Sequence, residues 1–457
     1  MNKDLETNPN ASVRVVPGGP VSGSIRPPGS KSLTNRALIC AALAAGSSNL
    51  SGALRSEDTE VMIESLGTIG IEVESADAGR TLTVGGLNQD RLERDVLREL
   101  FVANSGTTIR FLTAALSALG GHYRLSGVER MHARPIGDLV DALSQVQAGS
   151  IAAQSEGHCP PVAIQSQGWS SSTISVAGNV SSQYLSGLMM AAPLAASSDQ
   201  PIKIEVVGTL VSRPYVDMTA EVMRSFGADV HISDADSQDG TRVVVGDGGY
   251  SGQTYSIEPD ASAASYFWAA AAITGGEVTV LGLHPGAMQG DVGFCRVLEQ
   301  MGCEFQTNSD GMMIRGRASR GIDIDMNAIS DTVQTLSVVA LFADGPTRVR
   351  GVAHNRFKET DRIGDLAVEL RKLGATVDEH EDGMTIVPPE KVVAATLETY
   401  NDHRMAMSFS LAGLAAEGIT VLNPACTAKT YPEYFADLEH LIGRPHHWGN
   451  SLDQTDR

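Results

Sequence analysis

The sequence predicts an α/β protein of two domains built from six similar units, each with several strands and two helices. Three observations support this prediction. The chain has 457 residues, whereas a single hydrophobic core stops growing near roughly 250–300 residues. Two phrases recur six times each, about seventy-odd residues apart, as expected for repeated structural units. Runs of β-branched residues lie between the phrases and predict strands.

The first phrase is a polar residue followed by small apolar residues and then a glycine or turn. Ser, Asn and Asp are preferred helix N-caps, so each opening residue predicts a helix start. The helices that follow, for example around residues 269–273, are apolar on every side, which predicts complete burial. The six openers are Ser30, Asn104, Ser181, Asp260, Asp331 and Asp402.

The second phrase is an amphipathic helix that ends in glycine and leads into a strand. Ile363, Leu366 and Leu370 lie three or four residues apart and form one apolar stripe, as on a half-exposed helix. Residues 202–207, 242–245 and 278–281 are β-branched runs that predict strands. The six glycines are Gly70, Gly149, Gly227, Gly302, Gly374 and Gly443.

Domain boundaries are expected at two places. The glycine-rich residues 246–252 fall between the third and fourth units, so three units belong to each domain. The corner Pro27-Pro28-Gly29 is a second candidate, and it would leave the first strand with the other domain.

The overall charge restricts the kind of partner. Lys and Arg number 34 and Asp and Glu 54, giving a net charge of −20. A chain this acidic does not bind nucleic acid through its general field. Any anionic ligand therefore requires a local cluster of cations.

Cysteine usage and the chain ends predict a cytoplasmic protein. The five cysteines include no Cys-x-x-Cys pair, which indicates free thiols in a reducing compartment. The first dozen residues lack the apolar stretch of a signal peptide, and no run approaches the length of a membrane span. From about His446 we expect a polar tail.

Cations gather at the starts of the predicted buried helices, at Lys31, Arg36, Arg110 and Arg404. Taken singly, each opener is most simply explained as a helix cap. Taken together, cations in a first turn oppose the helix dipole unless an anion lies between them, which favours anion binding. Residues 356–362 add three cations and two carboxylates, for which a solvated charged turn is the alternative.

Other chemistries fit less well. Residues 29–32 lack the G-x-x-x-x-G-K-[ST] spacing of a phosphate loop, and no G-x-G-x-x-G follows a strand. No H-E-x-x-H or G-x-S-x-G is present, so neither a metal site nor a serine nucleophile is predicted.

Nine segments resemble motifs of the 3-phosphoshikimate 1-carboxyvinyltransferase family, the EPSP synthases (EPSP is 5-enolpyruvylshikimate 3-phosphate). They run in the family's order over nearly the whole chain, so the resemblance is highly specific. The segments are GSKSLTNRAL at 29–38, NSGTTIR at 104–110, ARPIGDLVDAL at 133–143, SSQYLSGL at 181–188, SRPYVDMT at 212–219, DASAASYF at 260–267, KETDRI at 358–363, NDHRMAM at 401–407 and CTAKTYPEYF at 426–435.

The resemblance implies two similar inside-out α/β barrel domains, each of three βαβαββ repeats. Residues 1–29 with 256–457 would form the first domain and 30–255 the second, with the active site in the cleft between them. The implied reaction transfers the enolpyruvyl group of phosphoenolpyruvate to the 5-hydroxyl of shikimate 3-phosphate and releases phosphate. It implies no cofactor or metal, no nucleic-acid or membrane partner, and a monomer.

The resemblance also assigns site residues. The catalytic set is Lys31, Asp331 and Glu359, and either Lys31 or Glu359 delivers the proton to C3 of phosphoenolpyruvate. Shikimate 3-phosphate would be bound by Lys31, Ser32, Arg36, Ser181, Ser182, Gln183, Ser212, Tyr215, Asp331 and Lys358. Phosphoenolpyruvate would be bound by Lys31, Asn104, Gly106, Arg134, Gln183, Arg362, Arg404 and Lys429.

The sequence departs from the common family pattern at a few positions. Ser105, Thr108 and Phe111 stand where many members have Ala, Ala and Pro, and these positions bear on sensitivity to glyphosate, the family's phosphoenolpyruvate-site inhibitor. His354 stands where some members have Asn and receives no assignment.

Two alternatives remain. UDP-N-acetylglucosamine 1-carboxyvinyltransferases share the implied fold and donor, but they typically place a reactive Cys where this chain has Glu129. A non-catalytic binding protein on the same fold would be expected to lack charged site residues, which this chain retains.

Overall fold

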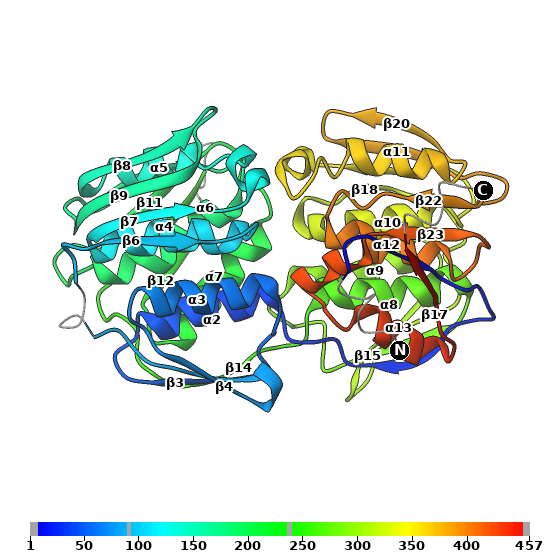
Figure 1. Ribbon diagram of the computed structural model, residues 1–457, viewed down its shortest axis with the longest axis horizontal. Helices are drawn as coiled ribbons and strands as arrows, with labels where there is room; N and C mark the ends of the chain where they lie inside the picture. The colour runs from blue at the N-terminus through cyan, green and yellow to red at the C-terminus, as the bar shows by residue number, and fades with distance from the viewer. Residues whose placement is uncertain (1–7, 89–92, 235–239, 451–457) are drawn as a thin grey trace. The chain divides into compact units, whose positions relative to one another are not determined.

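The computed structural model describes residues 8–88, 93–234 and 240–450. The chain divides into two compact units, unit 1 (Met1–Pro28 with Glu258–Arg457) and unit 2 (Gly29–Ile257). The ends of the predicted first domain, residues 1–7 and 451–457, lie outside the described residues. Each unit is considered separately below (Figure 1).

Unit 2 contains three four-stranded sheets, ordered β14-β3-β5-β4, β6-β7-β9-β8 and β10-β11-β13-β12 in the described residues. Its helices are α2 (Lys31–Ala42), α3 (Glu57–Thr68), α4 (Gly106–Leu119), α5 (Gly137–Ser144), α6 (Ser182–Ala191) and α7 (Arg213–Ser225). Its strands are β3 (Ser48–Ser51), β4 (Val73–Ala76), β5 (Thr81–Val84), β6 (Leu97–Phe101), β7 (Gly121–Ser126), β8 (Gln147–Ser155), β9 (Cys159–Trp169), β10 (Thr173–Ala177), β11 (Ile202–Val207), β12 (Val230–Asp234), β13 (Thr241–Val245) and β14 (Thr254–Ser256).

Unit 1 likewise has three sheets in its described residues, ordered β16-β17-β15-β2, β18-β19-β21-β20 and β22-β23-β1-β24. Its helices are α8 (Ala261–Thr274), α9 (Phe294–Gln300), α10 (Val333–Ala340), α11 (Gly364–Lys372), α12 (His403–Ala412) and α13 (Tyr434–Ile442). Its strands are β1 (Ala11–Arg14), β2 (Ser22–Ile25), β15 (Glu277–Leu281), β16 (Glu304–Thr307), β17 (Gly311–Arg315), β18 (Asp323–Asp325), β19 (Thr347–Arg350), β20 (Thr376–His380), β21 (Gly383–Val387), β22 (Ala395–Leu397), β23 (Ile419–Leu422) and β24 (His447–Asn450).

Every sheet follows one plan. The first strand pairs in parallel with the second across a buried helix, as β6 does with β7 and β10 with β11. An amphipathic helix then leads to an antiparallel hairpin whose last strand lies between the second and third, as β9 and β13 do. This is the βαβαββ repeat, which is continuous in sequence in three of the six described sheets, while the other three have the same strand order.

Three sheets are completed by strands distant in sequence. β2 pairs with β15, and β14 pairs with β3. Each of β2 and β14 is the last strand before the chain passes into the other unit, and each joins a sheet of its own unit (Figure 1). β1 lies between β23 and β24, where the hairpin strand lies in the other sheets. The prediction of a polar tail from His446 is therefore wrong at its start, because residues 447–450 form β24 and pair with β1.

The buried helices are α2, α4, α6, α8, α10 and α12. In α8 the side chains of Ala261–Ile273 are all buried, as the absence of a polar face predicts. Within each unit the three buried helices contact one another. Side chains cap four of them as predicted: Ser30, Ser181, Asp260 and Asp402 each accept a backbone N–H of the first turn.

Two predicted helix starts and one predicted end are wrong. α4 is capped by Ser105 rather than Asn104, and α10 begins at Val333, after the 3₁₀ helix η6 (Asn327–Thr332) that contains Asp331. Gly149 does not end a helix, because α5 stops at Ser144 and Gly149 lies in β8. A Cβ at Gly149 would meet the Gln165 carbonyl oxygen at 2.0 Å, so glycine permits close pairing with β9.

Candidate active site

Arg362 is the centre of the candidate site in unit 1. It lies just before α11 and is 2% exposed. Its Nε donates to Asp402 Oδ2 at 2.7 Å and its Nη2 to Asp402 Oδ1 at 3.1 Å. Asp402 also caps α12, where its Oδ1 accepts the backbone N–H of Arg404 at 2.9 Å. One carboxylate thus joins the start of α11 to the start of α12.

Two further carboxylates, Glu359 and Asp331, contact Arg362, and each also contacts a second cation. Glu359 Oε2 lies 2.9 Å from Arg362 Nη2, and its Oε1 accepts from Lys429 Nζ at 2.8 Å. Asp331 Oδ2 accepts from Arg404 Nη2 at 2.6 Å, and its Oδ1 lies 3.4 Å from Arg362 Nη1. We call these six residues the unit 1 cluster: Asp331, Glu359, Arg362, Asp402, Arg404 and Lys429.

Charge in the unit 1 cluster is balanced, with three cations and three carboxylates. Burial alone would lower the pKa of Arg362, but Asp402 and Glu359 raise it above its usual value. Five of the six residues are less than 10% exposed (Glu359, Arg362, Asp402, Arg404 and Lys429). An anion that binds these cations must compete with the carboxylates, so anion binding would change which carboxylates are held.

His354 lies close enough to both Lys358 and Asp331 for their charges to act on it. His354 follows β19 in the 3₁₀ helix η7 (Ala353–Phe357), and its Nε2 is 3.0 Å from Ser330 Oγ. Burial, and then the positive charge of Lys358, lower the pKa of His354 to about 3, against the opposing effect of Asp331. His354 is therefore a neutral imidazole at physiological pH.

Asp291 is a buried acid that the sequence did not indicate. It lies in the 3₁₀ helix η5 (Gly290–Gly293), is 4% exposed, and accepts a hydrogen bond from Ser262 Oγ. Burial and then the charge of Asp331 raise its pKa to about 7, although Ser262 and Arg404 act in the opposite direction. A large fraction of Asp291 is thus protonated at neutral pH.

Replacing Asp291 by Asn should stabilise the protein at alkaline pH. The folded-state pKa of Asp291 lies above the roughly 3.9 of an unfolded Asp. The contribution of Asp291 to the stability of the wild type is therefore greatest at low pH, and it is lost as pH rises through about 7. The Asn variant lacks this loss. Its advantage in free energy of unfolding should grow by up to about 1.4 kcal/mol per pH unit across that window.

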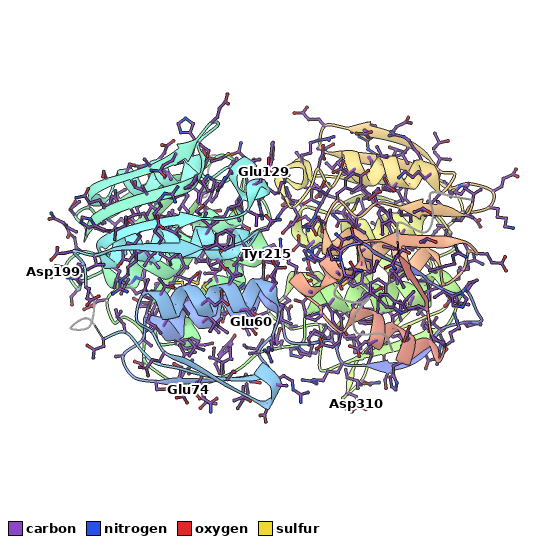
Figure 2. The ribbon with its side chains drawn as sticks, in the orientation of Figure 1. Glu60, Glu74, Glu129, Asp199, Tyr215 and Asp310 are labelled. Atoms are coloured by element: carbon purple, nitrogen blue, oxygen red, sulfur yellow. The ribbon has the colours of Figure 1, made fainter. Side chains whose placement is uncertain are left out.

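Thermal unfolding at pH 5 and pH 8 measures this difference. Asp310→Asn is the control, because Asp310 is exposed in the turn before β17 (Figure 2). An equal effect of Asp291→Asn at both pH values would show that the carboxylate is charged throughout.

In unit 2, Lys31 begins α2, the first buried helix. Its Nζ lies 3.3 Å from Asp58 Oδ2 on α3, and Asp58 is buried. Ser30 caps the helix by accepting the Leu33 N–H at 3.4 Å, and Ser32 is half-buried in the same turn. A lysine in this first turn opposes the helix dipole, and Asp58 offsets part of that cost.

Arg36, one turn further along α2, donates most of its hydrogen bonds to other residues of unit 2. Its Nε donates to Thr219 Oγ1 at 2.7 Å, its Nη1 to the Ser32 carbonyl, and its Nη2 to Ser186 Oγ and the Tyr215 carbonyl. Among the described residues, partners are found for four of its five N–H groups, and the second N–H of Nη1 can serve a ligand. Burial lowers its pKa to about 10, so the guanidinium stays charged at neutral pH.

Arg134 lies after the 3₁₀ helix η3 (Glu129–Ala133) and is 3% exposed. Its Nη1 donates to the Asn104 carbonyl at 3.0 Å and to Asn104 Oδ1 at 3.2 Å. Gly106, the first residue of α4, lies against the same guanidinium. A Cβ on Gly106 would be 2.4 Å from Arg134 Nη2. The absence of a side chain at Gly106 therefore leaves the space that the Arg134 guanidinium occupies.

The family resemblance assigns Gly106 and Arg134 to phosphoenolpyruvate, and on that expectation replacing Gly106 by Ala should weaken its binding. The added methyl group displaces the Arg134 guanidinium, so we expect KM for phosphoenolpyruvate to rise about tenfold or more, the loss of one charge-assisted contact. KM for shikimate 3-phosphate should stay within about twofold. The control is Gly67→Ala in α3, where a Cβ meets nothing within 4 Å. Unchanged KM values in Gly106→Ala would contradict the expectation that Arg134 binds phosphoenolpyruvate.

Gln183, at the start of α6, is oriented by α4. Its Oε1 accepts from Arg110 Nη1 at 2.5 Å, and its Nε2 donates to Thr107 Oγ1 at 3.3 Å. Ser181 caps α6 by accepting the Gln183 backbone N–H at 3.3 Å, and Ser182 is buried beside it. The starts of α4 and α6 thus lie together, as anion binding by several helix N-termini requires.

Ser212 and Tyr215 mark the start of α7 (Figure 2 labels Tyr215). Ser212 precedes the helix with φ 53° and ψ 45°, a left-handed conformation that is uncommon for serine. The Tyr215 ring lies over the Arg36 guanidinium, 5.9 Å from its central carbon. This contact brings α7 to the first turns of α2.

The predicted site residues thus form two groups. Unit 2 carries Lys31, Ser32, Arg36, Asn104, Gly106, Arg134, Ser181, Ser182, Gln183, Ser212 and Tyr215, and unit 1 carries Asp331, Lys358, Glu359, Arg362, Arg404 and Lys429. The sequence reasoning did not assign Asp402, Asp58 or Asp291 to the site. In the sequence Asp402 indicates only a helix cap, and nothing in its spacing from Arg362 indicates that the two form a pair.

Other features of the described residues lie apart from these groups. A cavity of about 880 Å³ in unit 1, lined among others by Phe342, Pro389 and Glu417, contains none of the predicted site residues. All five cysteines are free thiols, as predicted, and all five are buried. In the described part of the chain, no three His, Cys, Asp or Glu side chains are arranged to hold a metal ion. Every described helix is too short or too polar to span a bilayer.

Comparison with known proteins identifies the family. A family model described as EPSP synthase (3-phosphoshikimate 1-carboxyvinyltransferase) matches residues 15–438. The chain belongs to the EPSP synthase family. Among its relatives is the chloroplastic 3-phosphoshikimate 1-carboxyvinyltransferase of Arabidopsis thaliana, 44% identical over 92% of this chain and 82% of that protein. The enzyme of the same name from Shewanella halifaxensis is 43% identical over 94% of this chain and 99% of that protein.

Solved structures of the family have the same fold. An EPSP synthase from Acinetobacter baumannii matches with a TM-score of 0.76 and 25% identity, over 96% of this chain and all of that one. This match confirms the predicted fold class of two inside-out α/β barrels of βαβαββ repeats.

Proposed function

We propose that this chain is a 3-phosphoshikimate 1-carboxyvinyltransferase that transfers the enolpyruvyl group of phosphoenolpyruvate to the 5-hydroxyl of shikimate 3-phosphate and releases phosphate. One observation in particular supports this. Glu359 is held between Arg362 and Lys429, so the same buried place offers cations for an anionic donor and a carboxylate for proton transfer. Such a pairing suits a reaction that needs anion binding and acid–base chemistry together.

Phosphoenolpyruvate would be bound by the cations that the resemblance assigns to it. In unit 1, Arg362, Arg404 and Lys429 are directed at carboxylates that the anionic donor can replace. In unit 2, Arg134 is fixed beside Gly106 and Asn104, with Lys31 and Gln183 completing the set. Guanidinium groups suit this donor because they pair with carboxylate and phosphate in two-pronged fashion.

Shikimate 3-phosphate would be bound chiefly by unit 2. Ser181, Ser182 and Gln183 at the start of α6 offer hydroxyls and backbone N–H groups for the 3-phosphate, as helix N-termini do for anions. Lys31, Ser32, Ser212 and Tyr215 line the starts of α2 and α7. The remaining N–H of Arg36 would contact the acceptor, and Asp331 with Lys358 would approach its 5-hydroxyl.

The chemistry then divides between two carboxylates. When phosphoenolpyruvate draws Arg362 and Lys429 toward itself, their hold on Glu359 weakens and its protonated form is favoured. Glu359 protonates C3, C2 becomes electrophilic, and the 5-hydroxyl oxygen adds to it while Asp331 accepts the hydroxyl proton. Loss of phosphate and return of one C3 proton to Glu359 form the product, and the hydroxyl proton leaves with the phosphate.

Lys31 is the alternative donor of the C3 proton. Its Nζ lies 3.3 Å from the buried Asp58 carboxylate, and a lysine side chain offers several N–H donors to a bound anion. Glu359 is therefore the stronger candidate for proton transfer, and Lys31 for electrostatic stabilisation.

Product analysis tests the proposed reaction. After incubation with both substrates, NMR should show an enol ether on the 5-oxygen of shikimate 3-phosphate and an equimolar amount of free phosphate. An enolpyruvyl group on another oxygen, or phosphate release without an ether, would contradict the proposal. Recovery of both substrates unchanged would favour a non-catalytic binding protein.

The alternative donor–acceptor pair, with UDP-N-acetylglucosamine, has less support. Glu129, exposed at the start of η3, occupies the position at which that enzyme typically carries a reactive thiol (Figure 2). The only cysteines of unit 2, Cys40 and Cys159, are buried elsewhere. The expectations of a monomer, of a cytoplasmic location and of no nucleic-acid partner stay predictions, and sedimentation of the purified chain would test the first.

A further inference from the structure

Glu369 is a fully buried carboxylate that the reaction above does not use. It lies on α11, seven residues after Arg362, and its side chain is 0% exposed. A buried charge of this kind is costly unless partners satisfy it. Lys372, on the same helix, supplies one partner, with its Nζ 2.7 Å from Glu369 Oε2. The other partners come from a distant part of the chain.

Those partners belong to the turn that leads from β22 to α12. The Tyr400 hydroxyl donates to Glu369 Oε1 at 2.7 Å, and the Glu398 backbone N–H donates to Glu369 Oε2 at 3.0 Å. Both bonds are charge-assisted, which makes them about twice as strong as neutral ones. Glu369 therefore fastens the segment before α12 onto α11.

The fastened segment has a strained backbone. Tyr400 and Asn401 have φ values of 52° and 56°, a left-handed pair that non-glycine residues rarely adopt. Such a conformation persists only where the surroundings hold it. Glu369 holds its first residue through the tyrosine hydroxyl, while Asn423 Nδ2 donates to Asn401 Oδ1 at 3.2 Å on the other side.

The strained pair is followed directly by two residues of the unit 1 cluster. The Asp402 N–H donates to the Thr399 carbonyl at 2.8 Å, which closes the turn and places the Asp402 carboxylate against Arg362. Arg404 follows in the first turn of α12 and contacts Asp331. The segment is thus held at two places, by Arg362 just before α11 through Asp402 and by Glu369 on α11 through Tyr400.

We propose that Glu369 is a positioning residue for enolpyruvyl transfer, whose carboxylate holds the Tyr400–Asn401 turn and thereby sets Asp402 and Arg404 for phosphoenolpyruvate. The proposal rests on the proposed function for the role of Arg404. It assigns Glu369 no contact with substrate. Its effect is to keep the start of α12 in the conformation that the cations require.

Two substitutions interrupt the contact from its two sides. Glu369→Gln removes the charge, and Tyr400→Phe removes only a hydroxyl from a residue that is 38% exposed, so the second variant should fold even if the first does not. Each should raise KM for phosphoenolpyruvate about tenfold, as expected for a lost charge-assisted hydrogen bond. KM for shikimate 3-phosphate should change by less than about twofold, and the double variant should resemble the worse single variant because both break one bond.

Hydrogen exchange of the unliganded protein gives a readout that needs no activity. Peptides covering residues 399–404 should exchange faster in Glu369→Gln and Tyr400→Phe than in wild type, because the Asp402 and Arg404 N–H bonds depend on this turn. The matched control is Glu379→Gln, which breaks a surface ion pair of Arg371 on the same helix and does not contact the turn.

The outcomes separate the two proposals. Faster exchange with a raised KM for phosphoenolpyruvate supports the positioning role. Unchanged exchange, or faster exchange with unchanged KM values in active variants, overturns it, and a loss of thermal stability alone marks Glu369 as merely structural. If the wild type catalyses no enolpyruvyl transfer, the proposed function fails, and the positioning role for that reaction fails with it. Faster exchange would then show only that Glu369 holds the turn.

Discussion

Replacing Glu359 by Gln is expected to lower kcat by about 10²–10⁴-fold, the usual contribution of a general acid–base group. The variant should still bind shikimate 3-phosphate, because that substrate is assigned chiefly to unit 2. Gln keeps the size of the side chain but can neither give nor take the C3 proton. Steady-state kinetics would measure kcat, and calorimetric titration would separately measure the affinity for shikimate 3-phosphate.

The Glu359 result needs a control for the loss of charge. Lys429 and Arg362 each lose a carboxylate partner in this variant, so phosphoenolpyruvate binding could tighten while turnover falls. Glu390→Gln, at an exposed position of unit 1, should behave as wild type. A Glu359→Gln variant with wild-type kcat would exclude Glu359 as the proton donor and leave Lys31.

Replacing Arg362 by Met should destabilise the protein by about 3–5 kcal/mol, because one partner of a buried ion pair is removed and the other charges stay. Asp402 would lose its two-pronged partner, and Asp331 and Glu359 would each lose a cation. The affinity of the variant for phosphoenolpyruvate should also fall, because Arg362 is one of the cations proposed to bind it. Urea unfolding at neutral pH measures the change in free energy.

Arg371→Met provides the comparison, on the helix that begins just after Arg362. Arg371 pairs with Glu379 at 3.0 Å near the surface, with its side chain 42% exposed. Exposed pairs contribute about 0–1 kcal/mol, so this variant should unfold close to wild type. If the two variants lost equal stability, Arg362 would not be acting as the centre of a buried cluster.

The parts of the fold predicted from sequence are those that local chemistry decides. The caps at Ser30, Ser181, Asp260 and Asp402 form because a side-chain oxygen next to a helical stretch accepts the first free N–H groups. The stripe on α11 is buried because it is the only apolar face of that helix. Both features need only a few neighbouring residues.

The features that sequence did not predict depend on distant segments. β24 forms because β1, more than 400 residues earlier in the chain, pairs with it, so its residues look like a polar tail. Gly149 follows an amphipathic stretch and so looks like a helix end. In the structure it is a glycine because a side chain there would collide with the Gln165 carbonyl of β9.

The candidate site shows the same division. The cations could be recognised by their clustering at helix starts and by family motifs. The carboxylate partners could not, because Asp402 and Asp58 reach Arg362 and Lys31 only in the folded chain. Glu369 gave no sequence signal either, since a glutamate on an amphipathic helix ordinarily faces water.

The most direct test of the account is the acceptor dependence of phosphate release. Purified protein should release phosphate from phosphoenolpyruvate when shikimate 3-phosphate is present, and should release none with phosphoenolpyruvate alone or with UDP-N-acetylglucosamine. Release that depends on UDP-N-acetylglucosamine, or that proceeds without any acceptor, would contradict the assignment.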